Sequence, residues 1–162
     1  DVPPDSAVAR LERAFRESNG DLKVVANTLV DLPEAWAGDA RKFRTPQEWT
    51  IPVLRAFNAA EASERIAPVL RQLRHPLWSP QAPKGFGDTM QEWADSDALM
   101  NRAELARTVA RQLRDRPVEP RQLLTVVDVQ DNDPLRTLLA DTSIPAGERI
   151  ALAIAGPAFQ WR

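Results

Sequence analysis

The sequence predicts an all-α fold, and three observations carry that prediction. Apolar residues recur every three or four positions through most of the 162 residues. Several of these segments begin with an N-cap residue or with proline at the first helical position, which are signals of helix starts. LLTVVDV, at residues 123–129, is the one segment with strand character. We therefore expect a single multi-helix domain over residues 1–162. Residues 123–129 are the segment most able to form a strand instead and so the main uncertainty in the all-α prediction.

Two helices are expected at the N-terminal end of the chain. Apolar residues at i, i+3 and i+7 define the first helix, and Asn19-Gly20 is a pair typical of a helix end. These apolar residues are Val8, Leu11 and Phe15. Asp21 can then cap a second helix that runs to Val30.

The rest of the chain predicts six further helices. The third helix of the chain begins at a capping box, Thr45-Pro46-Gln47-Glu48, with proline at the first helical position. Ser96 is expected to cap the longest helix, in which small residues such as Ala106 and Ala110 form a seam for a neighbouring helix. The remaining helices are expected near residues 61–73, 119–127, 134–140 and 145–155.

Composition and charge disfavour several classes of function. Twenty-one basic and 23 acidic side chains give a net charge of −2, which argues against a nucleic-acid-binding face. No apolar run approaches the roughly 20 residues of a membrane span. Because the chain has no cysteine and one histidine, thiolate metal sites and cysteine nucleophiles are excluded, and a serine triad would depend on His75. We predict no catalytic residue, metal or cofactor, and whether the chain is an enzyme stays open.

A proline-rich loop, RHPLWSPQAPKGFGDTMQEW at residues 74–93, holds the candidate ligand-binding residues. They are His75, Trp78, Phe86, Asp88, Glu92 and Trp93. Aromatic rings beside paired carboxylates suit a sugar-binding or glycosidase cleft, where rings stack on the sugar and carboxyl groups transfer protons. Carboxylates also stabilise helix starts, and a lone histidine is more often a packing residue, so we favour the structural account.

The tryptophans are expected to serve as aromatic anchors. Trp36 and Trp49 are expected in the core, because buried indoles supply a large apolar surface. Trp78, which lies between prolines, is the better candidate for a ligand or domain contact.

Several motifs resemble a bacterial family catalogued as domain of unknown function 1800. They are Pro33-Glu34-Ala35-Trp36, Arg41-Lys42-Phe43, Thr45-Pro46-Gln47-Glu48-Trp49, the loop itself, and residues 150–160. The resemblance implies the C-terminal part of a larger, mainly helical, exported protein, often encoded beside a twin-arginine-exported, sulfatase-like partner. It implies no catalytic residue. The chain departs from the family pattern in having His75 in place of glutamine, Trp78 in place of phenylalanine and Phe86 in place of tryptophan.

Two hypotheses about function follow from the residues and the resemblance. The first is a non-catalytic helical module of an exported or periplasmic protein, packing on the remainder of the same protein or on a co-exported protein. The second is a hydrolase or binding domain that acts on an extracellular polymer such as a polysaccharide.

Overall fold

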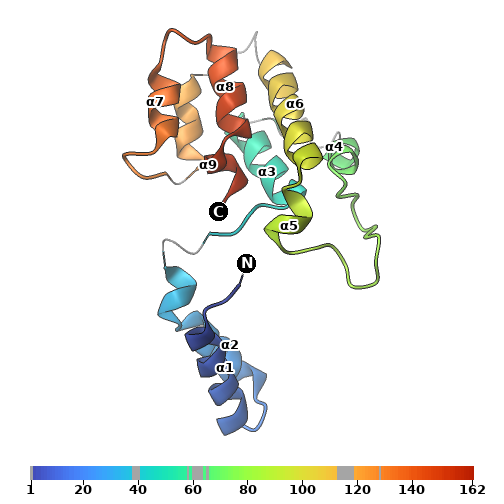
Figure 1. The fold of residues 1–162 in the computed structure, drawn as a ribbon, viewed down its shortest axis with the longest axis vertical. Coiled ribbons are helices and arrows are strands. Elements are labelled where there is room, and N and C mark those ends of the chain that lie inside the picture. Colours follow the sequence, from blue (N-terminus) through green and yellow to red (C-terminus); the bar gives the residue numbers. More distant parts are fainter. Residues whose placement is uncertain are drawn as a thin grey trace. The chain divides into compact units, whose positions relative to one another are not determined.

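The computed structural model describes residues 2–37, 41–57, 59, 64, 66–112, 119–127 and 129–162. By its internal contacts the chain divides into two compact units, Asp1–Lys42 and Phe43–Arg162, called unit 1 and unit 2 below. The regular elements of these described residues are all helical, which confirms the all-α prediction (Figure 1). Within the described part of 123–129, no strand forms, and the segment falls in a 3₁₀ helix and the turn after it.

Unit 1 is a helical hairpin followed by one turn of 3₁₀ helix. Its elements are α1 (Asp5–Glu17), α2 (Leu22–Val30) and η1 (Pro33–Trp36). The chain reverses through Asn19 and Gly20, both of which have positive φ, as expected from the sequence. The Asp21 carboxylate then accepts the backbone N–H groups of Lys23 and Val24 and so caps α2.

The hairpin buries very little of its apolar surface. Among its described residues only Ala7 and Leu32 are buried hydrophobic residues, and α2 buries none. The prediction of a core position for Trp36 is wrong, because its side chain is 74% exposed. Its indole N–H donates to the carbonyl of Val30 at 2.6 Å, so the ring lies along the end of α2. Two short helices and one turn leave no interior large enough for an indole.

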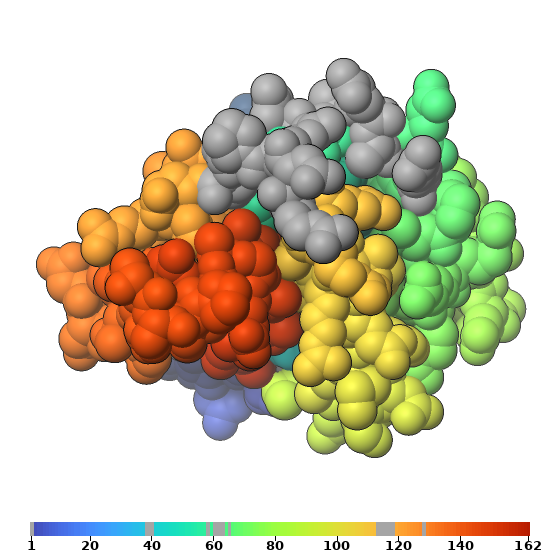
Figure 2. Space-filling view, turned by 90° about the horizontal axis from the view of Figure 1, so that it is seen from above, coloured from blue at the N-terminus to red at the C-terminus, as the bar shows by residue number. Residues whose placement is uncertain are grey.

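Unit 2 packs its helices around one core. They are α3 (Pro46–Ala56), α4 (Ile66–Gln72), α5 (Met90–Trp93), α6 (Ser96–Gln112), η3 (Pro120–Thr125), α7 (Pro134–Ala140), α8 (Ala146–Ala155) and α9 (Pro157–Gln160). The broadest contact joins α6 and α8, which run side by side in Figure 1 and abut in yellow and orange-red in Figure 2. The core includes Trp49, Val53, Phe57, Ala106, Leu123, Leu139, Ile150, Ile154 and Phe159.

The small residues of α6 explain the close approach of α8. Ala106 and Ala110 are buried in the core, as the predicted seam requires. The sequence pattern also places Leu99 and Leu113 on this seam, but Leu99 is partly exposed, and Leu113 lies outside the described residues. The cap of α6 is Asp95 rather than Ser96, because the Asp95 carboxylate accepts the N–H of Ala98 at 2.9 Å.

The other predicted helices are found with small differences. Thr45 and Glu48 form the expected capping box at the start of α3, and Asp133 caps α7. Of the helix predicted at residues 61–73, α4 accounts for Ile66–Gln72, while residues 61–63 and 65 lie outside the described residues. Near residues 119–127 the chain forms the 3₁₀ helix η3. The short helices α5 and α9 were not predicted, since four residues carry no periodic signal.

A buried arginine joins three parts of unit 2. Arg102 on α6 is 1% exposed. Its guanidinium donates to the Gln160 side-chain oxygen at 2.5 Å and to the Arg44 carbonyl at 2.8 Å. It also lies over the rings of Phe43 and Trp49, 4.9 and 5.9 Å from their centroids. Burial lowers the pKa of Arg102 to about 10, so the group stays charged at neutral pH and holds the start and end of unit 2 against α6.

Candidate functional site

The predicted ligand-binding residues lie in the loop between α4 and α5 and in α5 itself, and the first residues of the loop fold back onto α4. Arg74 has a φ of 62°, and the His75 N–H donates to the carbonyl of Leu70 at 2.8 Å, which is a helix-ending motif. His75 therefore leaves α4 with its ring turned toward the core rather than into solvent.

Three of the six candidates form one aromatic cluster. His75 is 8% exposed, and its ring lies edge-on to Phe86 at 4.2 Å and tilted against Trp93 at 5.1 Å. Its Nδ1 accepts the backbone N–H of Gln47 at 3.3 Å, in the first turn of α3. The cluster thus fastens the loop to α3.

The protonation state of His75 agrees with that role. Burial lowers the pKa of His75, and the nearby Glu48 carboxylate opposes this only in part. A neutral imidazole can accept the Gln47 N–H, whereas a protonated one cannot. The structure therefore uses the chain's one histidine as a packing and hydrogen-bonding residue.

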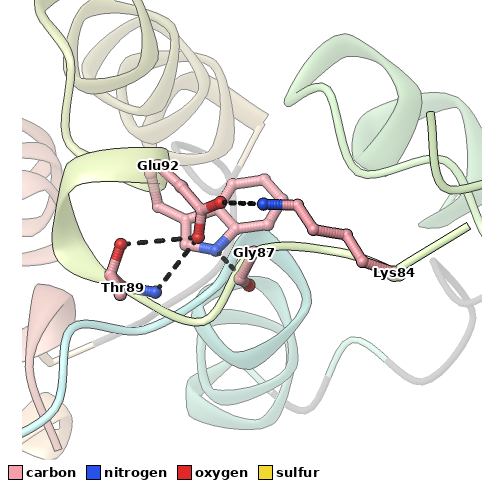
Figure 3. A network of polar contacts seen from close by, with 5 residues as sticks. Lys84, Gly87, Thr89 and Glu92 are labelled. Atoms are coloured by element: carbon pink, nitrogen blue, oxygen red, sulfur yellow. Dashed lines mark hydrogen bonds and ion pairs between the residues drawn. The ribbon is translucent and has the colours of Figure 1, made fainter. Parts of the chain in front are cut away.

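Glu92 folds back over the loop, as Figure 3 shows. One carboxylate oxygen accepts the backbone N–H and the hydroxyl of Thr89, both at 3.4 Å, and the other faces the Lys84 ammonium at 3.4 Å. The carboxylate lies directly over Gly87, where a Cβ would come within 1.9 Å of it. The Gly87 carbonyl in turn accepts the Trp93 indole N–H at 2.9 Å.

These contacts do not suit an acid catalyst. The backbone N–H of Thr89 is the main cause that lowers the pKa of Glu92, with Lys84 adding to it. Asp95 caps α6 and pairs with Arg74, and that pair lowers its pKa as well. A general acid of a glycosidase needs a raised pKa, so these two carboxylates act as helix-start and ion-pair groups.

Trp78 lies apart from the cluster. It is 97% exposed and has a φ of 58°, in a turn where the Ser79 N–H donates to the carbonyl of Pro76. Asp88 is also exposed, next to Gly87. Of the six candidates, the structure thus brings together His75, Phe86 and Trp93, with Glu92 beside them. Trp78 points elsewhere.

A groove in unit 1 was missed by the sequence reasoning. It has a volume of about 930 Å³, and apolar side chains form most of its wall. The lining includes Val2, Pro4, Ala7, Val8, Leu11, Phe15, Leu29, Leu32 and Ala35, with Glu12, Glu34, Arg41 and Lys42 as charged members. The signal was present in the apolar face of the first helix, but the sequence pattern was used only to predict the helix and not what its face contacts.

A second groove, of about 530 Å³, lies between α6 and α8 over alanine side chains. Neither groove is lined by any of the six loop candidates. Within the described part of the chain, no helix has the length and apolar character that crossing a bilayer requires.

A family model described as protein of unknown function (DUF1800) matches residues 1–161. No curated protein and no solved structure matches the chain.

Proposed function

The chain belongs to the DUF1800 family of proteins of unknown function, and we propose that it is a non-catalytic helical module that binds another polypeptide. The binding surface is the apolar face of the hairpin in unit 1. The partner is the remainder of the same protein or a co-exported protein, and the module acts in the periplasm or outside the cell. This location rests on the motifs of the DUF1800 family.

The observation that carries the proposal is the uncovered apolar surface of α1 and α2. Six of the nine residues of α2, LKVVANTLV, are apolar, yet the helix buries none of them. A helix that is apolar on most sides is usually buried between other elements. Val8, Phe15 and Leu29 line the groove with large exposed surfaces. Apolar grooves of this extent mark interaction sites in water-soluble folds.

A polypeptide suits this surface better than a small molecule does. Exposed apolar residues continue beyond the groove, at Leu22, Val30 and Trp36. A ligand that filled only the groove would leave them in water. A partner helix or hairpin could cover both regions at once, as happens in helical bundles.

Dye binding tests whether the groove is open to a partner. We expect the intact chain to enhance the fluorescence of 8-anilinonaphthalene-1-sulfonate, and Val8→Asp to remove most of that signal. Leu22→Asp is the matched control, because Leu22 is 72% exposed in the same hairpin but does not line the groove. Equal signals from the chain and Val8→Asp would contradict the proposal.

The fully exposed Trp78 favours a second candidate function, binding of an extracellular polymer such as a polysaccharide. An indole in water at a loop tip can stack on a sugar ring. Titration with soluble glucans, chitin oligosaccharides and peptidoglycan fragments would shift the tryptophan fluorescence of the chain if this were so, and Trp78→Ala would abolish the shift. If the chain cleaved any of these polymers, the second candidate function would be that of a hydrolase rather than of a binding domain.

A further inference from the structure

We infer that the loop at residues 74–93 is an acid-released clasp, which protonation of His75 frees from α3. The clasp lies in unit 2 and does not depend on the surface proposed for unit 1, so either can fail without the other.

The loop is fastened at two buried side chains. All of residues 74–93 are described by the structure, and among them only His75 and Trp93 are buried. Their rings contact each other, with centroids 5.1 Å apart, and the ring of Phe86 stands against both. The rest of the loop is exposed or half-buried. The attachment of the loop to unit 2 therefore depends on this pair of rings.

His75 makes its contact with α3 only as a neutral imidazole. The Gln47 N–H lies in the first turn of α3, where backbone N–H groups have no acceptor within the helix. It donates to Nδ1 of His75 at 3.3 Å. A protonated imidazole carries a hydrogen on both nitrogens, so two donors would then face each other. Acid therefore removes the hydrogen bond that joins the loop to α3.

The surroundings of His75 do not stabilise its charged form. A charge placed between two aromatic rings loses its hydration, and burial accordingly is the main cause that lowers the pKa of His75. The Glu48 carboxylate on α3 favours the charged form. That carboxylate already accepts the Thr45 N–H at 3.0 Å and pairs with Arg162 at 2.8 Å. It compensates the burial of His75 only in part.

The other charged side chains of the loop and of the helix ends beside it lie in solvent. They are Arg71, Arg74, Lys84, Asp88, Glu92 and Asp95. Arg74 pairs with Asp95, and Lys84 pairs with Glu92. Because all six are exposed, water and salt screen their effect on the buried ring. Burial and Glu48 therefore set the pKa of His75.

The released loop takes up the proton more readily than the fastened loop does. In the released loop His75 has its ordinary pKa of 6.5, whereas in the fastened loop the pKa is lower. The equilibrium constant for release therefore rises as the pH falls below about 6.5 and levels off below the lower pKa. Between about pH 7.5 and about pH 5.5, one such group can raise it by at most about tenfold. Release bares the rings of Phe86 and Trp93.

Amide hydrogen exchange of the intact chain at these two pH values tests the clasp. Exchange is expressed as protection factors, which remove the intrinsic pH dependence of exchange. We expect Gln47 to be less protected than the amides of α6 and α8, because release of the loop takes less free energy than unfolding of unit 2. Its protection should fall severalfold from about pH 7.5 to about pH 5.5, with about tenfold as the ceiling.

Leu135 is the matched control within unit 2. Its N–H lies in the first turn of α7 and donates to the Asp133 carboxylate at 2.8 Å, so it holds the same kind of position as Gln47 without a histidine acceptor. Its protection should stay constant between the two pH values.

Two variants assign the pH dependence to His75. In His75→Asn, a side-chain oxygen can accept the Gln47 N–H in place of Nδ1 and does not titrate, so the pH dependence should disappear. Glu48→Gln keeps a residue suited to the capping box but removes the carboxylate that favours the charged imidazole. The fall in Gln47 protection should then be larger and closer to tenfold. Circular dichroism confirms that each variant keeps its helix content.

Four results would overturn the clasp. Protection of Gln47 equal to that of α6 and α8 would mean that the loop leaves only when unit 2 unfolds. An equal fall at Leu135 would show a general loosening by acid. A pH dependence that survives His75→Asn would assign it to another group. A smaller fall in Glu48→Gln would contradict the balance between burial and Glu48.

Discussion

His75 gives the chain a pH dependence that can be assigned to one side chain. Burial lowers its pKa below the ordinary value of 6.5, so the unfolded chain takes up the proton before the folded chain does. The contribution of His75 to the free energy of unfolding is therefore complete above about pH 6.5. It decreases as the pH falls from there toward the lower pKa of the folded state. Urea unfolding at about pH 7.5 and about pH 5.5 should show this decrease in the free energy of unfolding. Both pH values lie above the range in which carboxylates titrate.

The control for this prediction is His75→Phe. It keeps a ring against Phe86 and Trp93 but leaves the Gln47 N–H without an acceptor, at a cost of about 1 kcal/mol. The pH slope should disappear in this variant. A slope that persists would mean that another group titrates, and the neutral-histidine interpretation would fail.

Arg102 is expected to be a major single contributor to the stability of unit 2. Arg102→Ala removes the donors to Gln160 and to the Arg44 carbonyl and leaves a cavity under Phe43, which should cost about 3 to 5 kcal/mol. Arg107→Ala, on the exposed side of the same helix, should stay within about 0.5 kcal/mol. Denaturant unfolding of both variants measures the difference, and a small loss for Arg102→Ala would show that its contacts are not needed.

At the scale of elements, the start of α5 depends on the absence of a side chain at Gly87. Gly87→Ala pushes the Glu92 carboxylate off Thr89 and Lys84 and should cost about 1 kcal/mol, the usual value of a lost helix-start contact. With Glu92→Ala already present, Gly87→Ala should be nearly neutral. A double-mutant cycle measures this coupling, and additive losses would argue against the geometry in Figure 3.

The turn that displays Trp78 is expected to gain stability when the tryptophan is removed. A left-handed backbone costs a non-glycine residue about 1 to 2 kcal/mol, and the exposed ring returns little packing. Trp78→Gly should therefore raise the free energy of unfolding by up to about 1 kcal/mol. Thermal and urea unfolding check this, and a clear destabilisation would show that the ring packs against the protein.

The sequence predicted those elements that have local causes. Asp21, Thr45 with Glu48, and Asp133 act within three residues of themselves, so their caps could be read directly. The loop site was harder, because spacing cannot tell whether an aromatic residue points inward. His75 and Trp93 turned into the fold while Trp78, of similar apolar character, turned into solvent.

The burial of Arg102 and the exposure of Trp36 have long-range causes. Arg102 meets Gln160, 58 residues away, and no local pattern encodes that meeting. Trp36 was assigned to a core on composition alone, whereas the hairpin that holds it has almost no interior. Periodicity identified the apolar faces of α1 and α2, but it does not say what covers them.

At the scale of the whole molecule, the two units differ in how they bury apolar surface. Unit 2 holds a contiguous core drawn from α3, α6, α7, α8 and α9, whereas unit 1 buries little more than Ala7 and Leu32. Helices with few buried contacts open locally at low free energy. A partner that binds only the folded hairpin raises its free energy of unfolding, so we expect unit 1 to gain most of its stability when it binds its partner.

Amide hydrogen exchange of the intact chain tests this central claim most directly. We predict fast exchange along α1 and α2 in the free chain and slow exchange in α6 and α8. Exchange in α1 and α2 as slow as in α6 and α8 would show that the apolar face is already covered and would contradict the account.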